Sequence, residues 1–122
     1  MRKAVYLSFP YRNDSIKNIE LVDILINKLA EVYPDYLIIS PLHLFGWVGK
    51  SELDEMEYDD DIMVFDLKLV DICDKVWIFD YTGKSVGCCF ERLEGIKTDK
   101  DVRVWTVDEI EQLLGVGIDD IC

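Results

Sequence analysis

The chain has 122 residues, of which half are hydrophobic and 11% aromatic, and its 13 basic and 25 acidic side chains give a net charge of −12. This composition predicts one folded domain over residues 1–122 and excludes a disordered chain. A polyanion is repelled by nucleic-acid backbones and by anionic lipid, so we expect neither as a partner. No run of 18 apolar residues and no signal-peptide pattern is present, which predicts a cytoplasmic protein without a membrane span.

The first part of the chain has the pattern strand, helix, strand. Residues 4–8 are rich in Val, Tyr and Leu and predict a buried strand, which ends at a polar turn over 9–14. Apolar residues then recur at helical spacing over 15–32 and predict an amphipathic helix. Residues 36–40 predict a second buried strand, and a polar and aromatic loop follows over 41–50.

A long helix is predicted over residues 51–74. Its first half is crowded with acids, among them the run 59–61, which favours a solvated face over a metal site because a hard cation needs ligands brought together in space. Asp66 interrupts the apolar second half, and its carboxylate either faces solvent or points to the ends of the strands. Four residues form the predicted apolar face: Ile62, Phe65, Leu69 and Ile72.

The rest of the chain continues the alternation of strands and helices. Strands are predicted at 75–80 and 102–105, with a short helix between them at 87–94. A threonine–glutamate capping-box pattern opens the last helix, over 106–114. The tail, 115–122, either packs on the surface or stays loose.

This alternation predicts an α/β fold: a doubly wound parallel sheet of the flavodoxin or Rossmann type, with strand order 2-1-3-4 and room for a fifth strand. Ligands of such sheets bind beyond the carboxyl ends of the strands. We therefore expect function in the segments that follow the strands, at 8–14, 40–45 and 80–91, and to a lesser extent at Thr106.

The segment after the third predicted strand is the most informative. Ser85 and Gly87 stand where a helix opens, and the free N–H groups and dipole of a helix start favour an anion. Glu91 lies four residues beyond Gly87. Two interpretations stay open: an anion site beside a carboxylate, or an N-cap serine with a glutamate that complements the helix dipole.

Other candidates also have two interpretations. Arg12, in the turn after the first strand, either meets a phosphate or is solvated, and Tyr6 is either a core or a catalytic residue. His43, in the loop after the second strand, is a candidate ligand contact. The four cysteines show no C-x-x-C spacing and the chain has one histidine, so we expect reduced cysteines in the core and no zinc site.

Taken in chain order, four motifs together resemble the nucleoside 2-deoxyribosyltransferase-like superfamily. They are Val5-Tyr6-Leu7-Ser8-x-Pro10-Tyr11-Arg12, Ser40-Pro41-x-His43-Leu44-Phe45, Asp66-Leu67-x4-Ile72-Cys73-Asp74-x-Val76-Trp77-Ile78-Phe79 and Ser85-x-Gly87-x3-Glu91. The resemblance spans about residues 3 to 106 and is strongest to small bacterial and phage members and to the 2′-deoxynucleoside 5′-phosphate N-hydrolases.

The resemblance implies chemistry at an N-glycosidic bond. Glu91 matches the glutamate that attacks or stabilises the anomeric carbon, and Tyr6 matches the tyrosine that orients this glutamate. Asp66 matches the acid that assists protonation of the leaving base or contacts the sugar. Ser85 together with Arg12 implies a ligand with a 5′-phosphate. The remaining ligand contacts that the resemblance implies are Ser8, Pro10, Tyr11, His43 and Gly87.

Two classes of function stay open, beside a third interpretation as a structural subunit with an incidental cleft. The first is a hydrolase or transferase that acts on a nucleoside or nucleotide. The second is a catalytically silent nucleotide-binding protein that senses or sequesters a nucleotide-derived signal in phage or bacterial defence. We expect no cofactor and no metal in either case. The resemblance and the apolar surface offered by Phe45, Trp47 and the helix over 51–74 predict a homodimer or higher homo-oligomer.

Overall fold

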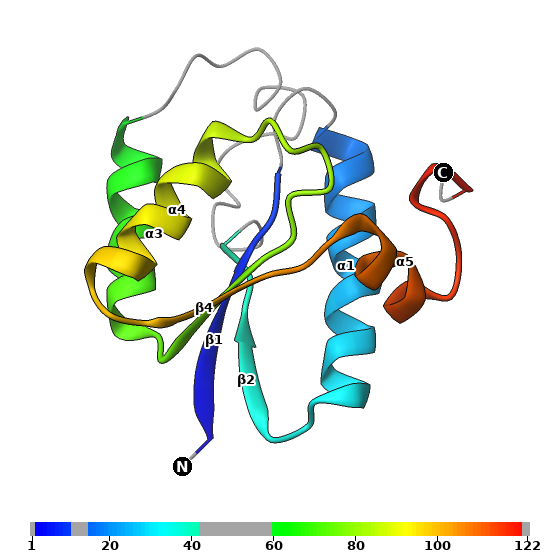
Figure 1. The fold of residues 1–122 in the computed structure, drawn as a ribbon, viewed down its shortest axis with the longest axis horizontal. Coiled ribbons are helices and arrows are strands. Elements are labelled where there is room, and N and C mark those ends of the chain that lie inside the picture. The colour runs from blue at the N-terminus through cyan, green and yellow to red at the C-terminus, as the bar shows by residue number, and fades with distance from the viewer. Residues whose placement is uncertain (1, 11–14, 42–59, 121–122) are drawn as a thin grey trace.

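The computed structural model describes residues 2–10, 15–41 and 60–120, and among these it has four strands and four α-helices (Figure 1). The strands are β1 (Lys3–Ser8), β2 (Tyr36–Ile39), β3 (Lys75–Ile78) and β4 (Asp101–Val104). The helices are α1 (Ser15–Val32), α3 (Asp60–Ile72), α4 (Val86–Lys97) and α5 (Val107–Leu114), followed by a 3₁₀ helix at Ile118–Asp120. No helix in the described ranges is long and apolar enough to cross a membrane.

The strands form an all-parallel sheet in the order β2-β1-β3-β4, as the sequence predicts. In the register of the sheet, Val5 of β1 lies between Ile38 of β2 and Lys75 of β3. Helices α3 and α4 cover one face, and α1 and α5 cover the other (Figure 1). The doubly wound fold is therefore confirmed, and within the described residues the sheet has no fifth strand.

Strand β1 contributes side chains to the packing on both faces of the sheet, because successive side chains of a strand point to opposite faces. Val5 and Leu7 belong to the core that also contains residues of α1 and α5. Tyr6 belongs to the core formed with α3 and α4, and Ser8 contacts Glu91 of α4. These four side chains are all buried, so one central strand carries core residues on one face and candidate site residues on the other.

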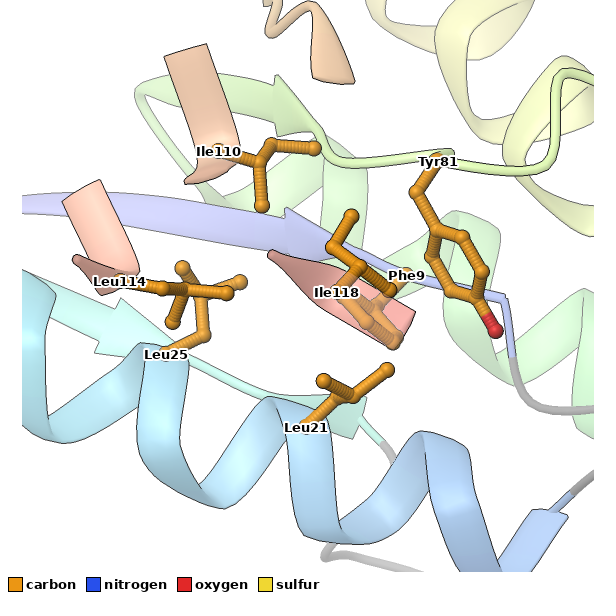
Figure 2. A pocket seen from close by; sticks show the side chains of 7 residues that line it. All are labelled: Phe9, Leu21, Leu25, Tyr81, Ile110, Leu114 and Ile118. Carbon is orange, nitrogen blue, oxygen red and sulfur yellow. The ribbon is translucent and has the colours of Figure 1, made fainter. Parts of the chain in front are cut away.

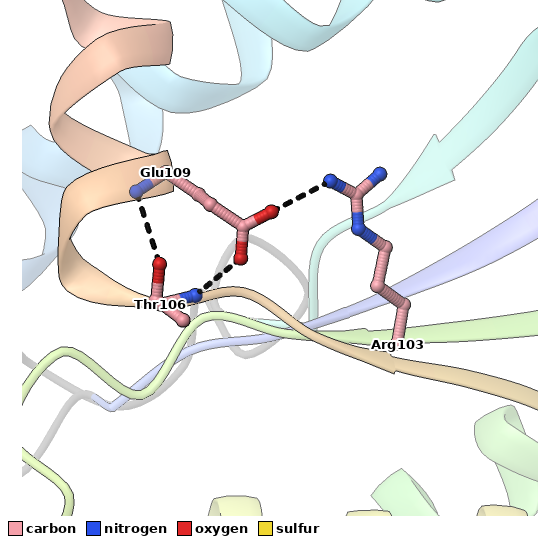
Figure 3. A network of polar contacts seen from close by, with 3 residues as sticks. All are labelled: Arg103, Thr106 and Glu109. Atoms are coloured by element: carbon pink, nitrogen blue, oxygen red, sulfur yellow. Dashed lines mark hydrogen bonds and ion pairs between the residues drawn. The ribbon is translucent and has the colours of Figure 1, made fainter.

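Helix α5 begins with the capping box that the sequence predicts. The Thr106 hydroxyl accepts a hydrogen bond from the backbone N–H of Glu109, and the Glu109 carboxylate accepts one from the backbone N–H of Thr106 (Figure 3). The other carboxylate oxygen of Glu109 pairs with Arg103 at 3.1 Å, and the Arg103 guanidinium lies 3.6 Å from the ring centre of Trp105. These contacts tie the start of α5 to the edge strand β4.

The tail packs on the surface, the first of the two predicted alternatives. The backbone N–H of Ile118 donates to the Glu111 carboxylate at 2.7 Å, and the Ile118 side chain is buried. Figure 2 shows that side chain closing an apolar pocket lined by Phe9, Leu21, Leu25, Tyr81, Ile110, Leu114 and Ile118 itself. The pocket has no room for a water molecule, so the tail completes the core on this face.

Two predictions about burial are wrong. Strand β2 was expected to be buried, but it lies at the edge of the sheet and Leu37 is 46% exposed. The apolar face predicted for the helix over 51–74 is turned outward at Phe65 and Ile72. The buried face of α3 instead carries Met63, Asp66 and Val70, because these positions follow each other at helical spacing toward the sheet.

The cysteine prediction holds in part. Cys73 and Cys88 are buried, free thiols, as expected for core residues, whereas Cys89 is free and exposed. Cys89 directly follows Cys88 on α4, and adjacent helix positions point in different directions, so both cannot face the sheet.

Candidate active site

Glu91 lies on the buried side of α4 against β1. Its Oε1 atom accepts a hydrogen bond from the Ser8 hydroxyl at 2.7 Å, and its Oε2 atom accepts one from the Tyr6 hydroxyl. The side chain is 4% exposed, and α4 has no acidic residue in its first turn, since it begins at Val86. The interpretation of Glu91 as a simple complement to the helix dipole is therefore wrong.

Asp66 is the second acid of this layer. It lies on the buried face of α3 and is 2% exposed, so the alternative in which it faces solvent is wrong. Its Oδ1 atom has no hydrogen-bond partner among the described residues. Its charge acts on both Glu91 and Tyr6, which places the three side chains in one electrostatic cluster. A buried, unpartnered carboxyl oxygen is costly unless a ligand or a proton satisfies it.

Burial dominates the protonation of these acids. It raises the pKa of Glu91 to about 8, with the charge of Asp66 adding to the rise and the hydrogen bonds from Tyr6 and Ser8 opposing it. Burial also raises the pKa of Asp66 to about 7. Within the described part of the chain, neither acid has a cation in an ion pair. The pair therefore holds a proton near neutral pH, so that one carboxyl group can donate a proton while the other is an anion.

Tyr6 acts in this cluster as a hydrogen-bond donor. Burial raises the pKa of its hydroxyl well above the usual value, and the charges of Glu91 and Asp66 raise it further. The phenol therefore stays protonated over the whole neutral range and keeps donating to Glu91. This contact agrees with the orienting role that the resemblance implies for Tyr6.

The segment before α4 is organised by Asp80, which lies two residues beyond the end of β3. The Asp80 carboxylate accepts backbone N–H bonds from Thr82 and Gly83 at 3.2 Å and from Ser85 at 3.0 Å. These donors, which an external anion would otherwise meet, are thus engaged by a side chain of the chain itself. The signal for this turn in the sequence is an aspartate three residues before a glycine, which the candidates named from the sequence do not include.

Ser85 is the N-cap of α4, so that interpretation of it is confirmed. Its Oγ atom accepts a hydrogen bond from the backbone N–H of Cys88 at 3.2 Å. The hydroxyl proton remains able to donate to a ligand, and so do the first-turn N–H groups of Val86 and Gly87, for which a helix supplies no internal partner. Gly87 faces Met63 of α3, because a Cβ atom on Gly87 would lie 3.7 Å from the Met63 Cε atom.

Cys88 is a neighbour of the site that sequence reasoning treated only as a core residue. Its thiol lies within hydrogen-bonding reach of the hydroxyls of Ser8 and Ser85, and burial raises its pKa to about 12. The signal was its position three residues before Glu91, which puts both on one face of a helix.

The described residues thus bring together Tyr6, Ser8, Asp66 and Glu91 between β1, α3 and α4. Ser85 and Gly87 open the helix that carries Glu91. Pro10 is buried just beyond the end of β1. The other residues predicted for ligand contact lie outside the described residues: Tyr11, Arg12 and His43.

Comparison with known proteins supports the fold. No protein-family model matches the chain, and no curated protein matches its sequence. Among solved structures, the chain is similar to a protein described as 2-desoxiribosyltransferase from Leishmania mexicana, with a TM-score of 0.60 and 14% sequence identity. The similarity covers 87% of this chain and 65% of that one, so the chain spans less than two thirds of its neighbour. The two proteins share the doubly wound α/β fold.

Proposed function

We propose that the chain binds a nucleoside or nucleotide at the carboxyl ends of β1 and β3 and breaks its N-glycosidic bond. The observation that carries this proposal is the buried pair of acids: Glu91, held at both oxygens by Tyr6 and Ser8, and Asp66, with an oxygen left for a ligand. Breaking this bond needs a carboxylate near a sugar carbon that becomes positive and a proton for the departing base. The cluster contains one group for each task.

In the proposed reaction, the Glu91 carboxylate acts at the sugar and Asp66 gives the proton to the base. Because the pKa of Glu91, about 8, exceeds that of Asp66, about 7, the proton of the pair passes from Glu91 to Asp66 when the ligand binds. As the bond between the sugar carbon and the base nitrogen breaks, its electron pair goes to the base, which takes the proton of Asp66. The Glu91 carboxylate stabilises the sugar cation or bonds to its anomeric carbon. A water molecule, in a hydrolase, or a second base, in a transferase, then attacks that carbon, frees Glu91 and returns a proton to Asp66.

A second candidate is a binding protein without turnover. The pKa of Glu91, about 8, favours it, because a carboxyl group that is mostly protonated at neutral pH is a poor nucleophile and a poor stabiliser of positive charge. In this case the cluster recognises a nucleotide-derived ligand through hydrogen bonds alone.

The Glu91→Gln variant distinguishes the two candidates. It keeps the size of the side chain and removes its charge, so an enzyme should lose roughly 10²-fold or more of its base release while ligand affinity changes little. We would measure base release by chromatography and binding by calorimetry, with nucleosides and nucleoside monophosphates as ligands. The matched control is Glu31→Gln, which removes an exposed acid from α1.

The outcomes separate clearly. Undiminished base release by Glu91→Gln would remove the catalytic role assigned to this residue. Tight nucleotide binding with no base release by the wild type would select the binding protein. A wild type that neither binds a nucleoside or nucleotide nor releases base would reject both candidates.

We further propose a nucleoside 5′-monophosphate as the ligand class. The Ser85 hydroxyl and the N–H groups of Val86 and Gly87 support it as donors at the start of α4, and Arg12 adds a charge. We expect monophosphates to bind more tightly than nucleosides, and Arg12→Ala to cost about 1.5–3 kcal/mol of monophosphate binding. Nucleoside binding should be unchanged in that variant. Equal calorimetric affinities for both ligand types in the wild type would contradict the phosphate assignment, because the phosphate would then add nothing to binding. The physical reason would be that Asp80 already occupies the neighbouring N–H donors.

A further inference from the structure

We infer that Ser8 is a positioning residue that fixes the Glu91 carboxylate, and that it acts through this glutamate rather than by touching a ligand. The inference rests on the proposed function for its catalytic meaning, whereas the contact itself stands on the geometry. Ser8 is fully buried and its hydroxyl donates to Glu91 Oε1 at 2.7 Å.

The placement follows from β1. Tyr6 and Ser8 are two residues apart on one strand and therefore point to the same face of the sheet. Each donates to a different oxygen of Glu91, Tyr6 to Oε2 and Ser8 to Oε1. One donor alone leaves a carboxylate free to turn about its terminal bond, whereas two donors on a rigid strand fix its plane.

The surroundings of Ser8 leave its proton directed at Glu91. Its second hydrogen-bonding neighbour is the thiol of Cys88, which is buried and, with its pKa raised to about 12, stays protonated. A protonated thiol can donate to the Ser8 oxygen, and the Ser8 proton is then used for Glu91. Among the described residues, the titratable groups that act on Glu91 are Asp66 of α3 and Tyr6 of β1, and neither is a cation.

This arrangement has an electrostatic effect. Burial and the charge of Asp66 favour protonated Glu91, and the hydrogen bonds from Tyr6 and Ser8 oppose them by stabilising the anion. Ser8 therefore adds to the fraction of Glu91 that is charged, which is the form that the proposed chemistry needs.

The test is Ser8→Ala in the full chain, read first without any ligand. Carboxyl ¹³C NMR follows the titration of Glu91, whose signal is identified by its absence in Glu91→Gln. We expect the pKa of Glu91 to rise by about one unit in Ser8→Ala, because a charge-assisted hydrogen bond is lost. Ser8→Thr keeps the hydroxyl and should restore the wild-type value. Thr98→Ala, which removes a hydroxyl from the far end of α4, should leave the Glu91 titration unchanged.

A second variant keeps the test decisive if the Ser8→Ala protein does not fold. Ser8→Cys keeps the shape of the side chain with a slightly larger atom and offers a weaker donor, so it should give a smaller shift in the same direction. A folded Ser8→Ala or Ser8→Cys protein with the wild-type Glu91 titration would overturn the inference.

The activity readout is separate. If the wild type releases base, the limb of the kcat–pH profile that belongs to Glu91 should move with the NMR titration in each variant. A limb that stays in place while the NMR value moves would overturn the positioning role. If the wild type releases no base, the proposed function fails, but the NMR result still decides whether Ser8 acts on Glu91.

Discussion

Each oxygen of Glu91 has a donor from β1, and an oxygen of Asp66 has no partner among the described residues. Two acids in one buried layer without a paired cation destabilise the folded state when both are charged. A protein keeps such a pair where the site needs it, and a ligand that donates hydrogen bonds or carries positive charge satisfies it.

We expect stability to fall as the pH rises from 5 to 8. The pKa of Asp66 in the folded chain, about 7, and that of Glu91, about 8, exceed those of ordinary carboxyl groups, so the folded state binds more protons than the unfolded state in this window. The free energy of unfolding therefore decreases with pH between the unfolded and the folded values. Urea unfolding at several pH values measures this slope.

Asp66→Asn is the diagnostic variant for this prediction. The amide stays neutral, so the slope with pH should become shallower and the variant should be the more stable protein at pH 8. Glu31→Gln removes one exposed charge and controls for the net charge of −12. Parallel slopes for the wild type and Asp66→Asn would contradict the expectation.

The members of this cluster could be predicted from the sequence, but their contacts could not. Tyr6, Asp66 and Glu91 were predicted as a group because they follow the pattern of a known superfamily. That Ser8 donates to Glu91 depends on the distance between β1 and α4, and that Asp80 holds the turn before α4 depends on backbone geometry. Neither quantity is encoded in spacing alone.

Helix α4 sits unusually close to the sheet at one point. A Cβ atom on Gly95 would lie 2.9 Å from the Cγ2 atom of Val102 and 3.1 Å from the Cγ2 atom of Val76. These methyl groups belong to β4 and β3 and have little freedom to move. The glycine thus sets the distance between helix and sheet for the element that carries Glu91.

Gly95→Ala should therefore destabilise the chain by about 1–3 kcal/mol through overpacking, less the gain of up to about 1 kcal/mol in helix propensity. Thermal and urea unfolding measure the loss. Gly87→Ala is the matched control on the same helix, because its Cβ atom would lie 3.7 Å from Met63 in ordinary contact. A Gly95→Ala protein as stable as Gly87→Ala would contradict the close approach.

At the scale of elements, the sequence predicts the order of the helices and strands better than it predicts which of their faces are buried. Periodicity and the capping box predict α1 and α5, since these signals are local. The prediction that β2 is buried was wrong because an apolar strand at the sheet edge has the same sequence pattern as a central one. The apolar face predicted for α3 was wrong because the face that this helix buries includes Asp66, a residue that hydrophobic periodicity alone would assign to solvent.

Across the whole molecule, exposed large apolar side chains gather on the layer formed by α3 and α4, which lie side by side (Figure 1). They include Val64, Phe65, Ile72, Val86, Phe90, Leu93 and Ile96. In a chain with a net charge of −12, exposed apolar side chains on one layer favour a protein partner over an anionic surface.

We propose that a second copy of the chain covers this layer, and we expect a homodimer at micromolar concentration by light scattering. Phe65→Glu should yield monomers, because Phe65 is 51% exposed on α3 and a charge there would be buried in the interface. Val32→Glu alters a residue of α1 that is similarly exposed, at 53%, and should leave the dimer intact. A monomeric wild type at this concentration would contradict the proposal.

The candidate site draws on distant parts of the chain. The contacts of Glu91 with Tyr6 and Ser8 span 85 and 83 positions, so they close one of the longest loops available to this sequence. Because β1 is central and parallel to its neighbours, it cannot be enclosed until β2 and β3 have joined it (Figure 1). Ligand binding should therefore be among the last properties to return during refolding, no earlier than the burial of Trp77 and Trp105 in the core.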